Sequence, residues 1–133
     1  MGTRYIIDTN IAIYFLDGLL PDYALPKMTL ILNQESNLSI VSKIELLGWS
    51  FPNTEKANST QIFVDSSFIF PLSNEVADKS IELRKAYKIK LPDAVIAATA
   101  LVYDITLISR NDKDFANIPA LKYYNPFIKD SAF

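Results

Sequence analysis

Carboxylates near the ends of predicted strands and helices are the residues of this chain best suited to chemistry. Each lies where a strand ends or a helix begins: Asp8, Glu45, Asp93, and Asp112 or Asp114. A helix N-terminus favours the ionised form of a carboxylate, and ionised carboxylates are the ligands that Mg²⁺ and Mn²⁺ prefer. Several carboxylates in one pocket repel each other, so without a cation at least one should have a raised pKa. The pattern therefore predicts a divalent metal site suited to phosphodiester hydrolysis, because such an ion activates water and stabilises charge on a phosphoryl oxygen.

Each of these acids also has a purely structural interpretation. In this interpretation Asp8 only caps the helix that follows it, since Asp favours strand-to-helix turns. Glu45 fits a capping box that begins at Ser42, in which the Ser caps the helix and the Glu reaches back. Asp93 then only interacts with a helix dipole, and the two later acids are ordinary loop charges. Spacing alone leaves these alternatives open.

The composition excludes several other kinds of catalytic site. Histidine and cysteine are absent, which removes Ser-His-Asp and Cys-His catalysis, the usual zinc hydrolases, thiolate metal sites and disulfides. The net charge of −2 argues against a wholly basic nucleic-acid surface, but it leaves room for a basic patch beside an acidic pocket.

Length and hydropathy predict one globular domain over residues 1–133. No apolar run is long enough to span a membrane, and the N-terminal residues lack the order of a signal peptide. We therefore expect no membrane association and a cytoplasmic location.

Apolar patterning predicts strands that alternate with helices. The predicted strands are 5–7, 38–41, 68–71, 106–108 and 121–124. The first predicted helix is capped by Thr9 or Asn10 and runs through Leu16. The other predicted helices are 21–33 with an interruption near Pro26, 42–48, 56–64, 73–87 and 92–103. Such alternation implies an α/β fold with a parallel sheet between helical layers. The helix over 92–103 is apolar nearly all round, so it should be central, with Ala97 and Ala98 buried.

Motifs in order along nearly the whole chain resemble those of one known family. They are Ile7-Asp8-Thr9-Asn10, residues 41–46 (VSKIEL), residues 91–100 (LPDAVIAATA), residues 107–115 (LISRNDKDF) and residues 122–127 (KYYNPF). On these motifs the chain resembles the PIN-domain ribonucleases, and within them the VapC-type toxins of toxin–antitoxin pairs.

The resemblance implies a three-layer α/β/α sandwich with a central parallel sheet, and metal-dependent endoribonuclease activity with Mg²⁺ or Mn²⁺. By position, Asp8, Glu45 and Asp93 match the three core acids, so they would be catalytic residues and metal ligands. Asp114 best matches the fourth. Asn111 stands where some members carry an acid, and Asp112 is a weaker match. The resemblance also implies a cognate antitoxin as partner and a homodimer.

Polar and basic residues around these acids would contact the RNA substrate. The set expected to do so is Thr9, Asn10, Ser109, Arg110, Asn111 and Lys113, with Lys43 and Lys88 as further cations for phosphates.

Two other functions use the same acids. A non-catalytic binding module would capture a basic side chain of a partner in the acidic pocket, because carboxylates accept a guanidinium well. A phosphatase of another α/β class would use Asp8 as nucleophile, although its usual second Asp is replaced here by Asn10.

Overall fold

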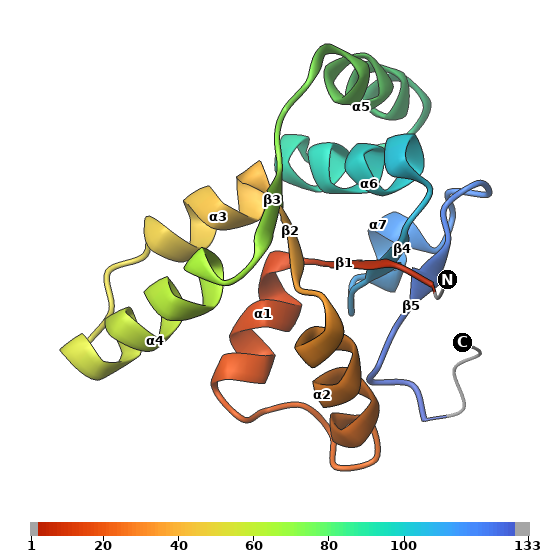
Figure 1. Cartoon of the computed structure of the whole chain (residues 1–133). Helices are drawn as coiled ribbons and strands as arrows, with labels where there is room; N and C mark the ends of the chain where they lie inside the picture. The colour runs from red at the N-terminus through yellow and green to blue at the C-terminus, as the bar shows by residue number, and fades with distance from the viewer. Residues whose placement is uncertain (1–2, 130–133) are drawn as a thin grey trace.

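The computed structural model describes residues 3–129, in which short parallel strands form the centre of the molecule. Strand β1 (Tyr5–Ile7) pairs with β4 (Thr106–Ile108), and β4 pairs with β5 (Tyr123–Tyr124). Strand β2 (Asn37–Ser39) pairs with β3 (Phe68–Phe70). The two ladders lie side by side at β1 and β2 (Figure 1).

Helices cover both faces of these strands. The helices are α1 (Thr9–Leu16), α2 (Leu25–Gln34), α3 (Ile40–Leu47), α4 (Thr54–Asp65), α5 (Asn74–Ala86), α6 (Leu91–Tyr103) and the short α7 (Asp112–Phe115). In Figure 1, α1 and α2 lie on one side of the strands, α5 and α6 lie on the other, and α3 and α4 extend away as a pair. The predicted three-layer α/β/α arrangement with a central parallel sheet is confirmed.

Alternation along the strands divides the hydrophobic core between the two faces. Ile6 and Leu107 pack into a cluster that contains the apolar residues of α5 and α6. Their chain neighbours Ile7 and Ile108 pack into a second cluster, with residues of α1, α2 and α3. Successive residues of a strand point to opposite faces, so two adjacent apolar residues supply two cores. This explains why β1 and β4 are continuously apolar.

Helix α6 is central, as predicted. Ala94, Ala97 and Ala98 are fully buried, and α6 packs closely against α5. Pro92 occupies the first turn, where its missing N–H leaves no hydrogen bond unmade. The helix thus holds Asp93 rigidly at its N-terminus.

Two sequence-based predictions are wrong where β2 ends and α3 begins. The strand predicted to reach Val41 ends at Ser39, whose side chain accepts a hydrogen bond from the Val41 N–H at 2.9 Å and caps α3. Ser42 therefore lies inside α3 and forms no capping box with Glu45. The Ser39 cap takes precedence over the β-propensity of Ile40 and Val41.

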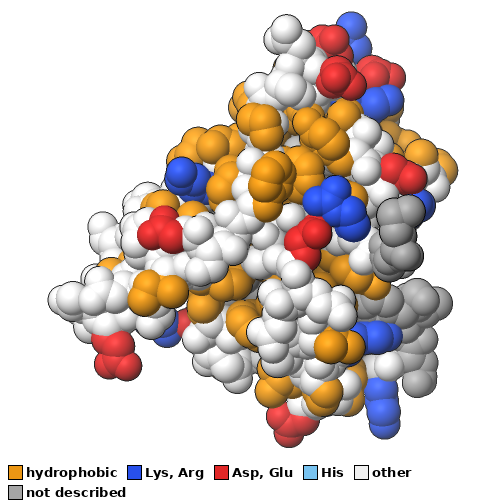
Figure 2. Space-filling model, in the orientation of Figure 1, with side chains coloured by type: hydrophobic (Ala, Val, Ile, Leu, Met, Phe, Trp, Pro, Cys, Tyr) orange, Lys and Arg blue, Asp and Glu red, His pale blue; other side chains and the backbone are white. Residues whose placement is uncertain are grey.

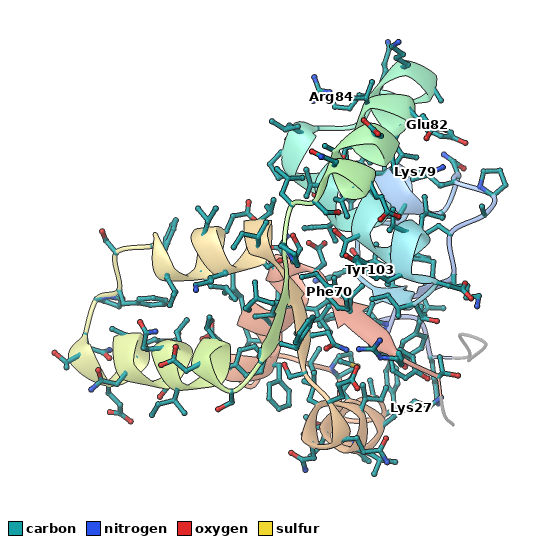
Figure 3. The ribbon with its side chains drawn as sticks, turned by 45° about the horizontal axis from the view of Figure 1, so that its top comes forward. Lys27, Phe70, Lys79, Glu82, Arg84 and Tyr103 are labelled. Carbon is teal, nitrogen blue, oxygen red and sulfur yellow. The ribbon has the colours of Figure 1, made fainter. Side chains whose placement is uncertain are left out.

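A partly exposed aromatic patch lies at β3 and α6, in which Phe70 itself is buried. Phe68 and Phe70 have ring centroids 4.8 Å apart, and Phe70 lies 4.6 Å from Tyr103. Figure 3 shows Phe70 and Tyr103 side by side, and Figure 2 shows hydrophobic side chains gathered over this region. Phe68 is 56% exposed and Tyr103 is 38% exposed. We call Phe68, Phe70 and Tyr103 the aromatic patch.

Candidate metal centre

Asp8 is a buried carboxylate held by hydrogen bonds from Thr9 and Ser109. Its N–H donates to the Ile108 carbonyl at 2.9 Å and so extends the β1–β4 pairing by one residue. Its side chain accepts from the Thr9 N–H at 2.8 Å and from the Ser109 hydroxyl at 2.9 Å. Burial raises the pKa of Asp8 above its usual value, although these two hydrogen bonds oppose the rise. Asp8 therefore caps α1 and also lines the pockets beside it.

Glu45 is held toward Asp8 by Thr9. The Thr9 hydroxyl donates to Glu45 Oε1 at 2.5 Å. The buried Ser42 hydroxyl lies 2.8 Å from the Thr9 hydroxyl, and since the Thr9 proton goes to Glu45, Ser42 is the donor between them. This chain of hydroxyls joins α3 to α1, and it directs a side chain that is otherwise exposed.

Asp93 and Asp114 meet from two different helices. Asp93 lies in the first turn of α6, and Asp114 lies in α7, where Asn111 Nδ2 donates to its Oδ2 at 2.9 Å. Burial raises the pKa of Asp93 to about 6, and the negative charges of Asp8, Asp114 and Glu45 add to the rise. A hydrogen bond between the Asp93 and Asp114 carboxyls favours the protonated form as well. The four acids are thus electrostatically coupled at Asp93.

The two alternatives to Asp114 lie differently. Asn111 caps α7 with its side-chain oxygen, which accepts from the Asp114 N–H at 3.3 Å. Asp112 accepts instead from the Tyr123 hydroxyl at 2.5 Å and from Asn125 Nδ2 at 3.0 Å. Asp112 is therefore engaged with β5 and the residues after it, whereas Asn111 and Asp114 line a pocket with Asp93.

Two pockets adjoin the four carboxylates. One, of about 640 Å³, is lined by Asp8, Glu45 and Asp93 together with apolar residues of α1 and of the segment between α3 and α4. The other, of about 540 Å³, is lined by Asp8, Asp93 and Asp114 together with three lysines. The acids thus lie between an apolar space and a basic one.

The residues expected to contact RNA fall into three groups. Thr9 and Ser109 are buried, and their hydroxyls are bonded to Glu45 and Asp8. Asn10, Asn111 and Lys113 line the pockets, as does Lys88. The remaining cations lie elsewhere: the Arg110 guanidinium lies 4.2 Å from the centre of the Phe127 ring, and Lys43 is exposed on α3.

The donor chemistry fits a hard divalent cation. All four candidate ligands are carboxylates, and within residues 3–129 none of them forms an ion pair with Lys or Arg. In the same part of the chain, no three acidic side chains converge closely enough to hold an ion as they stand. Carboxylates without a counter-ion repel each other, and a cation would draw them together.

Some residues of the site were not recognised from sequence. Sequence patterning predicts Ser42 as a helix cap, whereas in the structure its hydroxyl supports that of Thr9. Trp49 and Phe51, which line the apolar pocket, carried no motif. The Gly48-Trp49 pair directly after a helix was the available signal, because an exposed Trp after a helix end has no core to fill.

This chain is similar to one protein family and to several solved structures. The family model described as PIN domain matches residues 5–121. A toxin–antitoxin complex from Klebsiella pneumoniae is 29% identical with a TM-score of 0.74, covering 92% of this chain and 98% of that chain. VapBC2 from Rickettsia felis, bound to a DNA fragment from its promoter, is 25% identical with a TM-score of 0.78 and the same coverage of both chains.

A third structure, DNA-bound VapBC from Salmonella typhimurium, shares the fold with a TM-score of 0.80 at 16% identity, covering 94% of this chain and 99% of that chain. No curated protein matches this chain. Among residues 3–129, no helix is both long and apolar enough to cross a lipid bilayer.

Proposed function

This chain belongs to the PIN-domain family, and we propose that it is a Mg²⁺- or Mn²⁺-dependent endoribonuclease that acts as the toxin of a toxin–antitoxin pair. The reaction is hydrolysis of an RNA phosphodiester, in which water attacks phosphorus and one P–O ester bond breaks. We propose a cytoplasmic location for the protein, because its proposed RNA substrate is found there.

The observation that supports the proposal most strongly is the electrostatic environment of Asp93. Its pKa rises to about 6 because it is partly buried and because three other carboxylates lie near it. Such a cluster suits a site whose charge is balanced by a cation and not by protein side chains. A cluster that served only to cap helices would gain nothing from bringing these four acids together.

Each carboxylate has a distinct part in the proposal. Asp8 and Asp93 are the principal metal ligands, since rigid elements fix both of them. Asp114 completes the ligand set, and Glu45, directed by Thr9, orients the attacking water. When bound, the divalent ion supplies Lewis-acid stabilisation of the charge that develops on the phosphate.

Cleavage of RNA by the purified protein tests the proposal. A panel of structured RNAs is incubated with wild type and with Asp8→Asn, each with Mg²⁺, with Mn²⁺ and with chelator. We expect cleavage that needs the metal and is lost in Asp8→Asn, with circular dichroism unchanged. Equal cleavage by both proteins would indicate a contaminating nuclease. Absence of cleavage together with binding of Arg-rich peptides would favour a non-catalytic module.

We further propose two protein partners. Structures similar to this chain are toxin–antitoxin complexes, so we propose that a cognate antitoxin binds this chain as well. The aromatic patch would bury exposed ring surface in a homodimer, since contiguous apolar surface marks interaction sites.

A further inference from the structure

The two pockets beside the carboxylates differ in chemistry but share a boundary. Both are lined by Asp8, Asn10 and Asp93, so both open onto the same carboxylates. One is lined mainly by apolar and aromatic side chains, and the other carries basic ones. A ligand that contacts both pockets would present negative charge to the lysines of one and a flat apolar group to the aromatic side chains of the other.

The basic pocket suits phosphate groups. Lys88, Lys90 and Lys113 line it, all three are exposed, and within residues 3–129 none of them is in an ion pair. The basic surface continues along the end of α5 to Arg84, which Figure 3 labels and which borders the neighbouring pocket with Lys88 and Lys90. Three ammonium groups at one pocket provide the charge that neutralises phosphates of a nucleic-acid strand.

The apolar pocket suits an unpaired base. Trp49 is 69% exposed and borders this pocket together with Phe51 and Pro52. Ile13 and Leu16 form the part of the lining that α1 supplies. An exposed indole face beside apolar residues is a stacking platform of the kind that binds bases of single strands without hydrogen-bond readout.

We propose that a single strand of RNA crosses the carboxylates, with its phosphates on Lys88, Lys90 and Lys113 and an unpaired base stacked on Trp49. This path rests on the proposed ribonuclease function, and it adds the residues of this chain that hold the strand: three lysines for phosphates and Trp49 for a base. In a duplex the bases are stacked inside the helix, so no base reaches the Trp49 pocket.

The chain offers a direct probe, because Trp49 is its one tryptophan. Asp8→Asn protein, in which cleavage is blocked, is titrated with a single-stranded RNA and with a duplex of equal length while Trp fluorescence and RNA anisotropy are recorded. We expect the single strand to quench Trp49 and the duplex to leave it unchanged. Anisotropy showing that RNA binds without quenching would overturn the proposal, and so would equal quenching by the duplex.

Substitutions test the two ends of the path separately. Trp49→Ala should weaken single-strand binding about tenfold or more, Trp49→Phe should largely restore it, and Leu30→Ala, at an exposed position on α2, should have no effect. Replacing the three lysines with Gln should reduce the slope of log affinity against log salt by about 2, at about 0.7 per phosphate contact. The matched control carries Lys79→Gln, Lys85→Gln and Lys122→Gln, which make the same charge change outside both pockets and should leave the slope unchanged.

The outcomes separate this inference from the function on which it rests. If wild type cuts RNA and the Trp49 and lysine variants bind and cut as wild type does, the path is wrong and the function stands. If wild type cuts no RNA, the function fails and the path fails with it. If a basic peptide quenches Trp49 and single-stranded RNA does not, the apolar pocket belongs to a protein partner and the proposal is overturned.

Discussion

At Asp93, burial and three neighbouring negative charges act together to raise the pKa. The nearby carboxyl of Asp114 adds to the rise of its pKa, and a proton or a cation relieves the repulsion between neighbouring carboxylates. Without metal, a proton supplies the balance at mildly acidic pH, and near neutrality the repulsion remains. The free energy of unfolding of the metal-free protein should therefore depend on pH.

The first prediction concerns pH and Asp93. Its pKa in the folded protein is about 6, above the ordinary 3.8, so the folded state binds more protons between these values. The contribution of Asp93 to the free energy of unfolding therefore falls as the pH rises through this window. Asp93→Asn should be more stable than wild type at pH 7 without metal, and the difference in Tm should shrink toward pH 4.

Thermal melts in chelator across this pH range measure the effect. Asp78→Asn on α5 is the control, because Asp78 is exposed and lies outside both pockets. A Tm difference for Asp93→Asn that stayed constant with pH would show that the pKa of Asp93 is not raised in the folded protein.

The second prediction concerns Thr9 as a positioning residue. Thr9→Val removes the hydroxyl that directs Glu45 and leaves the buried Ser42 hydroxyl without its partner, at a cost of about 1–3 kcal/mol. RNA cleavage should fall mainly through kcat, and Thr9→Ser should restore it. A Thr9→Val protein that cuts RNA at the wild-type rate would show that cleavage does not need Thr9 to position Glu45.

At the residue scale the sequence indicated which acids matter but not what holds them. Asp8 and Asp93 could be placed because each adjoins a strand end or a Pro-marked helix start. The support of Glu45 could not, because it depends on a contact between α1 and α3 and on a helix that begins at Ile40 and not at Ser42. In a helix of only eight residues, the capping residue decides which residue begins the helix.

At the scale of elements, α6 joins the core to the candidate site. Ala97 has no exposed surface, so Ala97→Leu should overpack the core and lower stability by about 1–3 kcal/mol. Ala86→Leu makes the same change at the exposed end of α5 and should be nearly neutral. Urea unfolding of both variants measures the difference, and a neutral Ala97→Leu would mean that α6 is peripheral.

Strands and helices were predictable to different degrees. The bounds of β1 and β4 agree with the prediction, because adjacent apolar residues end there in polar ones. Helix α2 begins at Leu25, with Pro26 in its first turn, so the proline starts this helix and does not interrupt it. The meeting of α6 and α7 at Asp93 and Asp114 depends on tertiary packing, which local patterning does not contain.

At the scale of the whole molecule, the aromatic patch is the surface proposed to join two copies. Phe68→Glu should convert a dimer to a monomer, because the substitution would bury an unpaired charge in the interface. Leu30→Glu, at a similarly exposed position on α2, should leave the dimer intact. Sedimentation equilibrium at micromolar concentrations measures both, and a wild-type monomer under these conditions would contradict the homodimer.

The carboxylates of β1, α3, α6 and α7 are the central claim, and binding of Mn²⁺ tests it most directly. Isothermal titration at pH 7.5 should show Mn²⁺ binding to wild type that weakens at pH 5.5, since protons compete for the same carboxylates. Asp93→Asn and Asp8→Asn should each lower the affinity at least about tenfold, whereas Asp112→Asn should not. Failure of wild type to bind Mn²⁺, or equal affinity in Asp93→Asn, would contradict the metal centre.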